Sequence, residues 1–273
     1  MLSDDWLSFY RIRPSKEKAY FMKQEIIATR VPQIIALYWI IKIASTTLGE
    51  TGADMFSMTF HLGYATTIFI FMVTFLLLLG VKLSLKRYEP LSYWLTFTAT
   101  AIVGTAISDF IDRTLGLGYA LGSFILVTLL GVVLYFWQKK DGTLSVEKIY
   151  TTSSELFYWI AFLIANTLGT AAGDFLADDL EIGFMQSATL ILMLLLGLLL
   201  LHYYTKISKI FLFWFAFVLT RPFGATFGDL LTKSHEHGGV DLGTVGSSAF
   251  FAGALLLALV FEINYEKINR FLK

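Results

Sequence analysis

Residues 39–63 read WIIKIASTTLGETGADMFSMTFHLG, and this segment sets a pattern that recurs through the chain. It begins at Trp39, places a glycine ten residues later and an aspartate fifteen residues later, and ends at Gly63. Three further copies follow, and a recurrence of this kind is typical of a protein built from structural repeats. The shared residues are Trp39, Trp94, Trp159 and Trp214, then Gly49, Gly104, Gly169 and Gly224, then Asp54, Asp109, Asp174 and Asp229.

The spacing between copies divides the chain into two halves. Residues 39–63 align with residues 159–183 without a gap, at a shift of 120. In the first three copies a glycine lies nine residues after the aspartate, whereas in the fourth copy Gly243 lies fourteen residues after it. The fourth copy therefore holds an insertion of five residues, around 233–239. We expect three parts: an N-terminal tail over 1–30, a first half over 31–145 and a second half over 146–273.

The composition is that of a membrane protein. Hydrophobic residues make up 56% of the chain and charged residues 15%, whereas soluble domains contain about 25% charged residues. Several stretches of 18 or more residues carry no charge, and a helix of that length crosses the roughly 30 Å hydrocarbon core of a bilayer. Because these stretches are continuous rather than alternating, they predict an all-α, polytopic helix bundle rather than a barrel. We expect eight transmembrane helices, at about 33–56, 62–82, 91–111, 117–138, 155–176, 182–203, 209–231 and 243–263.

The residue counts also exclude several classes of protein. The 21 basic residues are balanced by 21 acidic ones, so the chain offers no basic surface to a nucleic acid. It contains no cysteine, and hence no disulfide, thiolate nucleophile or cysteine-type zinc site. It also lacks an HExxH motif and a glycine-rich phosphate loop. We therefore predict a protein that is not an enzyme and has no resident organic cofactor.

Basic residues indicate how the bundle is oriented. Seventeen of the 21 lysines and arginines lie in the N-terminal tail, in alternate loops and at the C-terminus, on one side of the predicted bundle. The opposite loops contain only Arg113 and Lys233. The positive-inside rule then places both termini in the cytoplasm. Within the tail, the stretch 6–20 has the mixed character of an amphipathic helix that lies on the bilayer.

Each predicted repeat contains two helices, so every copy enters the membrane from the same side. The copies are therefore parallel repeats, related by an axis along the membrane normal. Each tryptophan lies near the cytoplasmic interface, where aromatic side chains are enriched. Each aspartate lies fifteen residues further along its helix, or about 22 Å at 1.5 Å per residue. We expect the four carboxylates at one depth, towards the outer side of the membrane.

Three stretches carry a resemblance to a known family. They are TLGETGAD at 47–54, NTLGTAAGD at 166–174 and TRPFGATFGD at 220–229. They resemble a bacterial family of uncharacterised integral membrane proteins that are built from a repeated membrane domain of unknown function. The resemblance covers about residues 31–263. It implies a multi-pass fold in the bacterial inner membrane, and it implies no activity.

The repeated aspartates are the main candidate site residues. A carboxylate inside a bilayer is costly unless it is paired, hydrated or protonated, and such residues mark ion pathways. Glu50, Thr105 and Thr170 each stand one helical turn before one of the aspartates. Carboxylate and hydroxyl oxygens are ligands that Mg²⁺, Ca²⁺ and Mn²⁺ prefer. We predict a metal site made by Asp54, Asp109, Asp174, Asp229 and Glu50, with Thr105, Thr170 and Arg221 in support.

Two basic residues lie inside predicted helices. Lys42 precedes Glu50 by eight residues, and Arg221 precedes Asp229 by eight. Such a residue either neutralises a buried acid or competes with a transported cation as a built-in counter-ion. For Lys42, near the inner interface, we expect neutralisation and a side chain that extends to the interface. For Arg221 both interpretations stand.

The pattern predicts a transporter of a small cation, either a divalent metal ion or an ion coupled to protons. The expected partners are the lipid bilayer and that cation, and a homo-oligomer is compatible with the sequence. The alternative is a non-catalytic structural or regulatory membrane protein, since repeated small residues also let transmembrane helices pack closely. His235 and His237 have the spacing of metal ligands, but we expect them to be solvated loop residues because no closed set of four ligands lies near them.

Overall fold

The computed structural model describes residues 29–271, so the stretch 6–20 and nearly all of the expected tail lie outside the described residues. Within that range the chain forms eight α-helices and no β-strand. The helices are α2 (Ala36–Asp54), α3 (Gly63–Leu85), α4 (Pro90–Asp109), α5 (Tyr119–Asp141), α6 (Thr152–Asp174), α7 (Phe184–Tyr204), α8 (Lys209–Thr232) and α9 (Thr244–Phe271). The prediction of an all-α fold is confirmed.

Local sequence explains where several of these helices begin. Pro90 occupies the first turn of α4, where its missing N–H costs nothing, and the Glu89 carboxylate accepts hydrogen bonds from the Leu91 and Ser92 backbone N–H groups. The Thr151 hydroxyl accepts a hydrogen bond from the Ser154 N–H at the start of α6. These side chains satisfy backbone donors that have no partner inside the helix.

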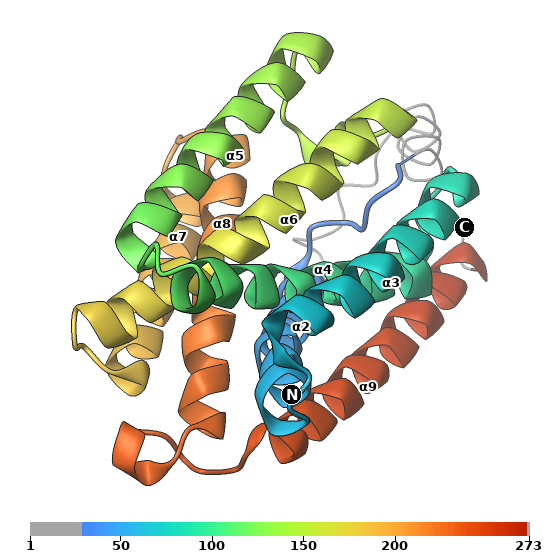
Figure 1. The fold of residues 1–273 in the computed structure, drawn as a ribbon. Helices are drawn as coiled ribbons and strands as arrows, with labels where there is room; N and C mark the ends of the chain where they lie inside the picture. The colour runs from blue at the N-terminus through green and yellow to red at the C-terminus, as the bar shows by residue number, and fades with distance from the viewer. Residues whose placement is uncertain (1–28, 272–273) are drawn as a thin grey trace, which may run out of the picture.

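The contacts between helices divide the bundle drawn in Figure 1 into an inner and an outer layer. The inner layer is a closed ring in which α2 packs on α4, α4 on α6, α6 on α8, and α8 on α2. In the outer layer, α3 packs on α4, α5 on α6, α7 on α8 and α9 on α2. The outer helix that follows each inner helix in sequence therefore covers the next inner helix of the ring. Because α9 returns to α2, the arrangement is cyclic although the chain is linear.

The repeated glycines let the inner helices approach one another. A Cβ atom on Gly104 would lie 2.8 Å from Asn166 Cβ, and one on Gly224 would lie 2.6 Å from Thr46 Oγ1. Gly49 and Gly169 face Ala101 and Arg221 in the same way. Each of these partners stands eight residues before the aspartate of its own copy, and that copy is the next one around the ring. The backbone of one inner helix therefore contacts a side chain of its neighbour.

The inner helices share an unusual end. After Asp54, Asp109 and Asp174 the chain widens into a π-helical turn: η2 (Met55–Thr59), η3 (Phe110–Thr114) and η5 (Phe175–Asp179). The fourth copy differs, because α8 ends at Thr232 and a longer loop follows, with a short 3₁₀ helix η6 (His235–His237). This loop contains the insertion that the spacing predicts. π-turns inside α-helices occur frequently at functional sites.

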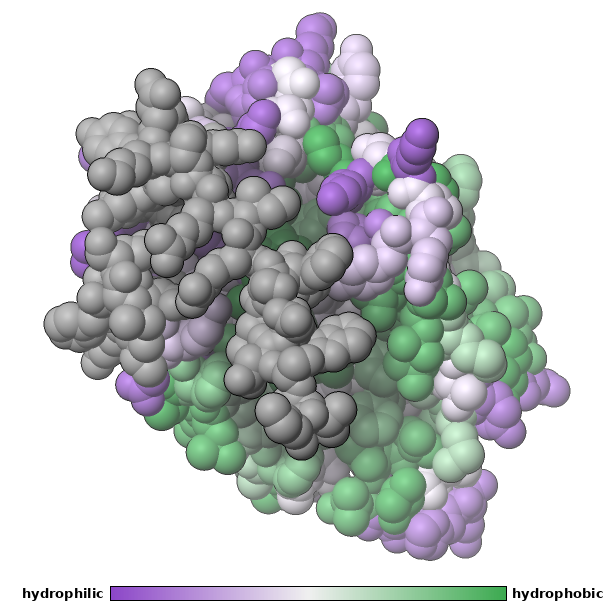
Figure 2. Space-filling model, turned by 180° about the vertical axis from the view of Figure 1, so that it is seen from behind, coloured by the Kyte–Doolittle hydropathy of each residue, from purple (hydrophilic) through white to green (hydrophobic). Residues whose placement is uncertain are grey.

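Seven of the described helices, α3 to α9, are long and apolar enough to cross a membrane. The outer helices expose most of their apolar side chains, whereas α4 and α6 are largely buried inside the bundle. Figure 2 shows apolar residues over the middle and lower part of one face, with hydrophilic residues at its top and lower right edge. An apolar surface of this extent is expected for a protein surrounded by lipid. The chain is therefore a multi-pass membrane protein.

Candidate cation site

The four repeated aspartates lie buried at one end of the inner ring, which we call the aspartate end. Lys233 bridges two of them: its Nζ lies 3.0 Å from Asp54 Oδ2 and 3.0 Å from Asp229 Oδ1. Burial disfavours the charge of Lys233, but the carboxylates of Asp229 and Asp54 outweigh this effect and raise the pKa of the ammonium group above its usual value. Lys233 is therefore an ion-pair partner of both acids.

Arg113 forms a similar bridge on the other side of the ring. Its Nη2 lies 3.3 Å from Asp174 Oδ2, and its Nε lies 3.4 Å from Asp109 Oδ1. The Nε also donates a hydrogen bond to the Tyr119 hydroxyl. Each bridge joins aspartates from neighbouring copies, so the four carboxylates form two pairs.

Arg113 and Lys233 are loop residues by their place in the sequence, whereas in the structure both contact the aspartates. The sequence does contain a signal for these contacts, because each basic residue stands four residues after a repeated aspartate. The two residues are also 120 positions apart, which is the shift that aligns the two halves. Residues four apart in a helix share a face. In the first and third copies the same position holds Met58 and Asp178, so the basic residue occurs in alternate copies only.

Below the aspartates, Arg221 lies at the centre of the ring and is almost fully buried. Its guanidinium is 3.2 Å from Glu50 Oε2 and donates a hydrogen bond of 2.8 Å to the Thr170 hydroxyl and another to the Thr105 hydroxyl. It also donates to the Thr46 carbonyl at 3.2 Å. The structure thus brings together Glu50, Thr105 and Thr170, which sequence reasoning placed at equivalent positions.

Arg221 and Lys42 both contact a helix other than their own. Arg221 pairs with Glu50 of α2 and not with Asp229 of its own helix. Lys42 is fully buried, so the prediction that it extends to the interface is wrong. Its Nζ donates to the Phe217 carbonyl at 2.9 Å and to the Thr220 hydroxyl, and lies 4.0 Å from the centre of the Phe217 ring. The reason is that α2 belongs to the inner ring, where this face points at α8.

Three of the predicted metal ligands form one compact set. Glu50, Asp54 and Asp229 each offer a carboxylate oxygen, and these oxygens lie within 4.8 Å of one another. All three side chains are buried. Carboxylate oxygens at such separations suit a hard cation such as Mg²⁺, Mn²⁺ or Ca²⁺. Asp109 and Asp174 lie outside this set and form the pair bridged by Arg113.

Several oxygens at the aspartate end accept no hydrogen bond from the residues that the structure describes. They are both carboxylate oxygens of Asp109, Oδ1 of Asp174 and Oδ1 of Asp229. Lys233 Nζ is near the last of these, but the geometry is that of an ion pair only. A buried carboxylate oxygen without a hydrogen-bond donor is costly, and a proton, a water or a cation relieves the cost.

Other sequence candidates lie apart from this set. In the loop after α8, His235 Nδ1 is 2.9 Å from the Gly239 carbonyl oxygen and His237 Nδ1 is 2.9 Å from the Ser234 hydroxyl. These ring nitrogens are thus engaged within the loop, which matches the expectation of solvated loop residues.

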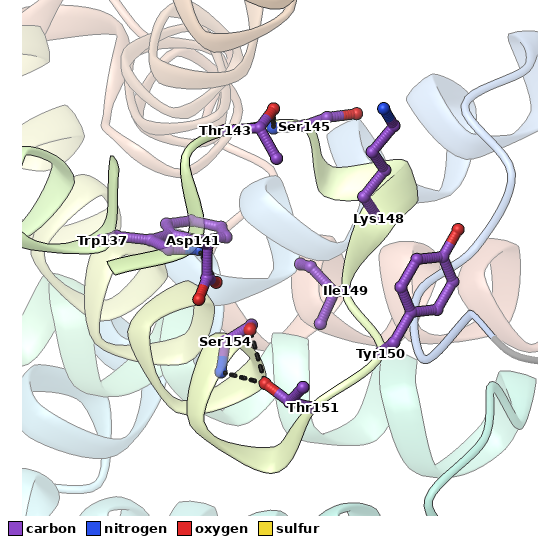
Figure 3. A pocket seen from close by; sticks show the side chains of 9 residues that line it. All are labelled: Trp137, Asp141, Thr143, Ser145, Lys148, Ile149, Tyr150, Thr151 and Ser154. Atoms are coloured by element: carbon purple, nitrogen blue, oxygen red, sulfur yellow. Dashed lines mark hydrogen bonds between the residues drawn. The ribbon is translucent and has the colours of Figure 1, made fainter. Parts of the chain in front are cut away.

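The opposite end of the ring, where α2, α4, α6 and α8 begin, is the tryptophan end. There the fully buried Glu155 accepts hydrogen bonds from Arg30 at 2.8 Å and from Lys82 at 2.7 Å. A pocket of about 270 Å³ lies near this end, between the end of α5 and the start of α6 (Figure 3). Trp137, Asp141 and Thr151 are among its lining residues, so the pocket is separate from the carboxylate set.

Sequence comparison matches four segments to one family, described as a Repeat of Unknown Function. The matched segments are 37–88, 92–143, 157–208 and 212–267. The chain belongs to the DUF347 family. Each DUF347 match covers most of one inner helix and of the outer helix that follows it, and each contains one of the repeated aspartates. No curated protein and no solved structure matches the chain.

Proposed function

We propose that the protein transports a small cation across the membrane and binds it at the carboxylates of Glu50, Asp54 and Asp229. The observation that carries this proposal is the compact set of three buried carboxylates inside a multi-pass membrane protein. Intramembrane carboxylates are costly and mark ion pathways. The donor set consists of oxygens only, which favours a hard divalent cation over a soft metal.

The proposed topology has eight transmembrane helices, formed by four parallel two-helix repeats. α2 is less apolar than the other seven helices because it carries Lys42, Glu50 and Asp54, but it lies in the ring between α4 and α8 and has similar length. Buried in protein, such a helix tolerates charges that lipid would not. The distribution of basic residues favours an orientation in the bacterial inner membrane with both termini in the cytoplasm and the aspartate end towards the outer side of the membrane.

A labelling experiment tests this orientation. The chain contains no cysteine, so a cysteine introduced at His237 is the sole target for thiol reagents. We expect a membrane-impermeant reagent to label it in intact spheroplasts, because the loop after α8 lies at the aspartate end. Labelling by permeant reagents alone would contradict the orientation.

In the proposed mechanism the cation enters at the aspartate end and exchanges water for carboxylate oxygens. Arg221 holds Glu50 in place, and the hydroxyls of Thr105 and Thr170 hold Arg221. Beyond Arg221 the axis is filled by Lys42 and by phenylalanine and tyrosine side chains, among them Phe162 and Phe217 with ring centres 4.2 Å apart. Release on the other side therefore requires the inner helices to move apart.

A flux assay tests the proposal. The purified protein is reconstituted in liposomes, and entry of Mn²⁺, Mg²⁺, Ca²⁺ and protons is followed with internal dyes. We expect flux of at least one of these ions, and we expect Asp54→Asn and Asp229→Asn to abolish it, since asparagine keeps the size and removes the charge. Asp141→Asn is the matched control, because Asp141 lies near the tryptophan end. A parent protein without flux above that of empty liposomes would refute the transport function.

A structural or regulatory role is the second candidate. It is favoured by the ion pairs themselves, because Lys233, Arg113 and Arg221 already neutralise much of the acidic charge. In that case the Asp→Asn variants lose stability without losing any flux, and the close glycine contacts are the main requirement of the fold. The flux assay, combined with thermal unfolding of the same variants, separates the two functions.

A further inference from the structure

Lys233 lies between two acids of the compact carboxylate set. Its ammonium group lies 3.0 Å from one oxygen each of Asp54 and Asp229, two of the three acids in the compact set. The third acid, Glu50, is paired with Arg221. An ammonium group is a cationic donor, so in this structure Lys233 stands in for an ion between the two carboxylates.

The side chain of Lys233 is also the most accessible member of this cluster. It is 24% exposed, whereas the carboxylates it contacts are 2% exposed. It follows the last residue of α8 directly and belongs to the longer loop that only the fourth copy has. A lysine side chain has a flexible four-carbon stem and a strongly hydrated head. It therefore reaches water by rotating about its own bonds, without unfolding a helix.

The symmetry-related side of the ring provides an internal comparison. At a shift of 120, Arg113 corresponds to Lys233, and Thr170 corresponds to Glu50. On the Arg113 side the equivalent positions therefore hold Asp109, Asp174 and the Thr170 hydroxyl, whereas on the Lys233 side they hold the three carboxylates of Asp229, Asp54 and Glu50. Arg113 is held in the π-turn η3 and also bonds to Tyr119. Only the Lys233 side combines three carboxylates with a basic residue on the longer loop.

Charge balance then indicates the kind of ion. With Lys233 and Arg221 in place, the three acids of the set keep one uncompensated negative charge. When Lys233 leaves, two negative charges remain uncompensated among buried oxygens, one of which, Asp229 Oδ1, already lacks a hydrogen-bond donor. A buried cluster of this charge is costly, and a single divalent cation neutralises it.

We infer that Lys233 is a tethered cation that a divalent metal ion displaces from Asp54 and Asp229 when it binds. The inference rests on the proposed function and deepens it, because it assigns the ion to the hard divalent class and gives the loop after α8 a role in loading. In the unloaded protein Lys233 prevents the carboxylates from repelling one another, and in the loaded protein it lies in the solvent.

Mn²⁺ binding to the purified protein tests this inference. The affinity is measured by titration calorimetry for the parent, for Lys233→Gln and for Arg113→Gln as the matched control. Removal of the competing charge predicts that Lys233→Gln binds Mn²⁺ tighter by about tenfold or more, equivalent to about 1.4 kcal/mol. We expect a much smaller change for Arg113→Gln, and parent-like affinity for Lys233→Arg, which keeps the charge. Asp54→Asn should remove the binding.

The outcomes separate this inference from the transport function. If Lys233→Gln binds Mn²⁺ no tighter than Arg113→Gln, the inference is overturned while the function stands. If neither the parent nor Lys233→Gln binds Mn²⁺ although the liposomes show proton flux, the inference also fails. If flux is absent as well, both fail. Thermal unfolding of each variant shows whether it is folded. If Lys233→Gln does not fold, the Mn²⁺ affinities of Lys233→Arg and Lys233→Met are compared instead.

Discussion

At the scale of single residues, the Arg221–Glu50 pair is the centre of the molecule. Arg221 comes from the fourth copy and Glu50 from the first, and their equivalents in the other copies are small, neutral or amide residues. A fourfold-repeated sequence thus places a single charge pair on its axis. Sequence spacing identified both residues as candidates, but it did not predict that they pair, because the spacing along one helix says nothing about which helices are neighbours.

The first prediction concerns this pair. Glu50→Gln leaves the Arg221 guanidinium buried without a counter-charge, so we expect a loss of about 3–5 kcal/mol in stability. Arg221→Gln should cost a similar amount. The double variant removes both charges, and it should therefore be less destabilised than the sum of the two single variants. Thermal unfolding in detergent measures all three.

Thr105→Val is the control for the pair, because it removes a hydroxyl that bonds to Arg221 and leaves the charges in place. It should cost less than Glu50→Gln and alter ion preference less. Strict additivity of Glu50→Gln and Arg221→Gln would show that the two groups do not interact as described.

At the scale of elements, the inner helices are fixed by their glycines. The sequence predicted these helices and the need for small residues on them, since both follow from spacing. It did not predict the π-turns after Asp54, Asp109 and Asp174, because no residue type specifies them. It also missed Arg113 and Lys233, whose partners belong to other copies and come close only when the ring closes.

The second prediction compares two glycines. Gly104 faces Asn166 and the Thr167 backbone N at under 3 Å from an added Cβ, whereas Gly131 of α5 has open space around it. Gly104→Ala should destabilise the protein by about 1–3 kcal/mol, because backbone on the neighbouring helix has to move. Gly131→Ala should be neutral or stabilising, since alanine is favoured over glycine in a helix by about 0.5–1 kcal/mol.

Unfolding midpoints of these two variants in the same detergent provide the measurement. Equal midpoints for Gly104→Ala and the parent would mean that the inner helices do not approach as closely as described. A similar loss in Gly131→Ala would mean that the effect is not specific to the inner ring.

At the scale of the whole molecule, the ring is closed by contacts between the halves. α4 packs on α6 and α8 on α2, while α5 covers α6 and α9 covers α2. Two similar halves and an all-helical membrane fold could be predicted from the sequence, because repeats and apolar runs are local features. Each outer helix packs on the inner helix of the next copy. This arrangement depends on the closed ring, so it could not be predicted from the sequence.

The third prediction follows from these contacts. Because four helix pairs join the halves, fragments 1–145 and 146–273 expressed together should associate, and a tag on one should purify the other. Gly104→Leu in the first fragment is the control, since it blocks the approach of α4 to α6 and should reduce the recovery of its partner. Fragments that never associate, or associate equally well with Gly104→Leu, would contradict the closed ring.

We propose that Glu50, Asp54 and Asp229 bind a divalent cation in the interior of the bundle. The most direct test of this binding is a crystal structure of the protein in Mn²⁺, with data collected for the anomalous scattering of the metal. We expect an anomalous peak within coordination distance of these three carboxylates, with the Lys233 side chain turned into solvent. An empty site at high Mn²⁺ concentration, with Lys233 still between Asp54 and Asp229, would contradict it.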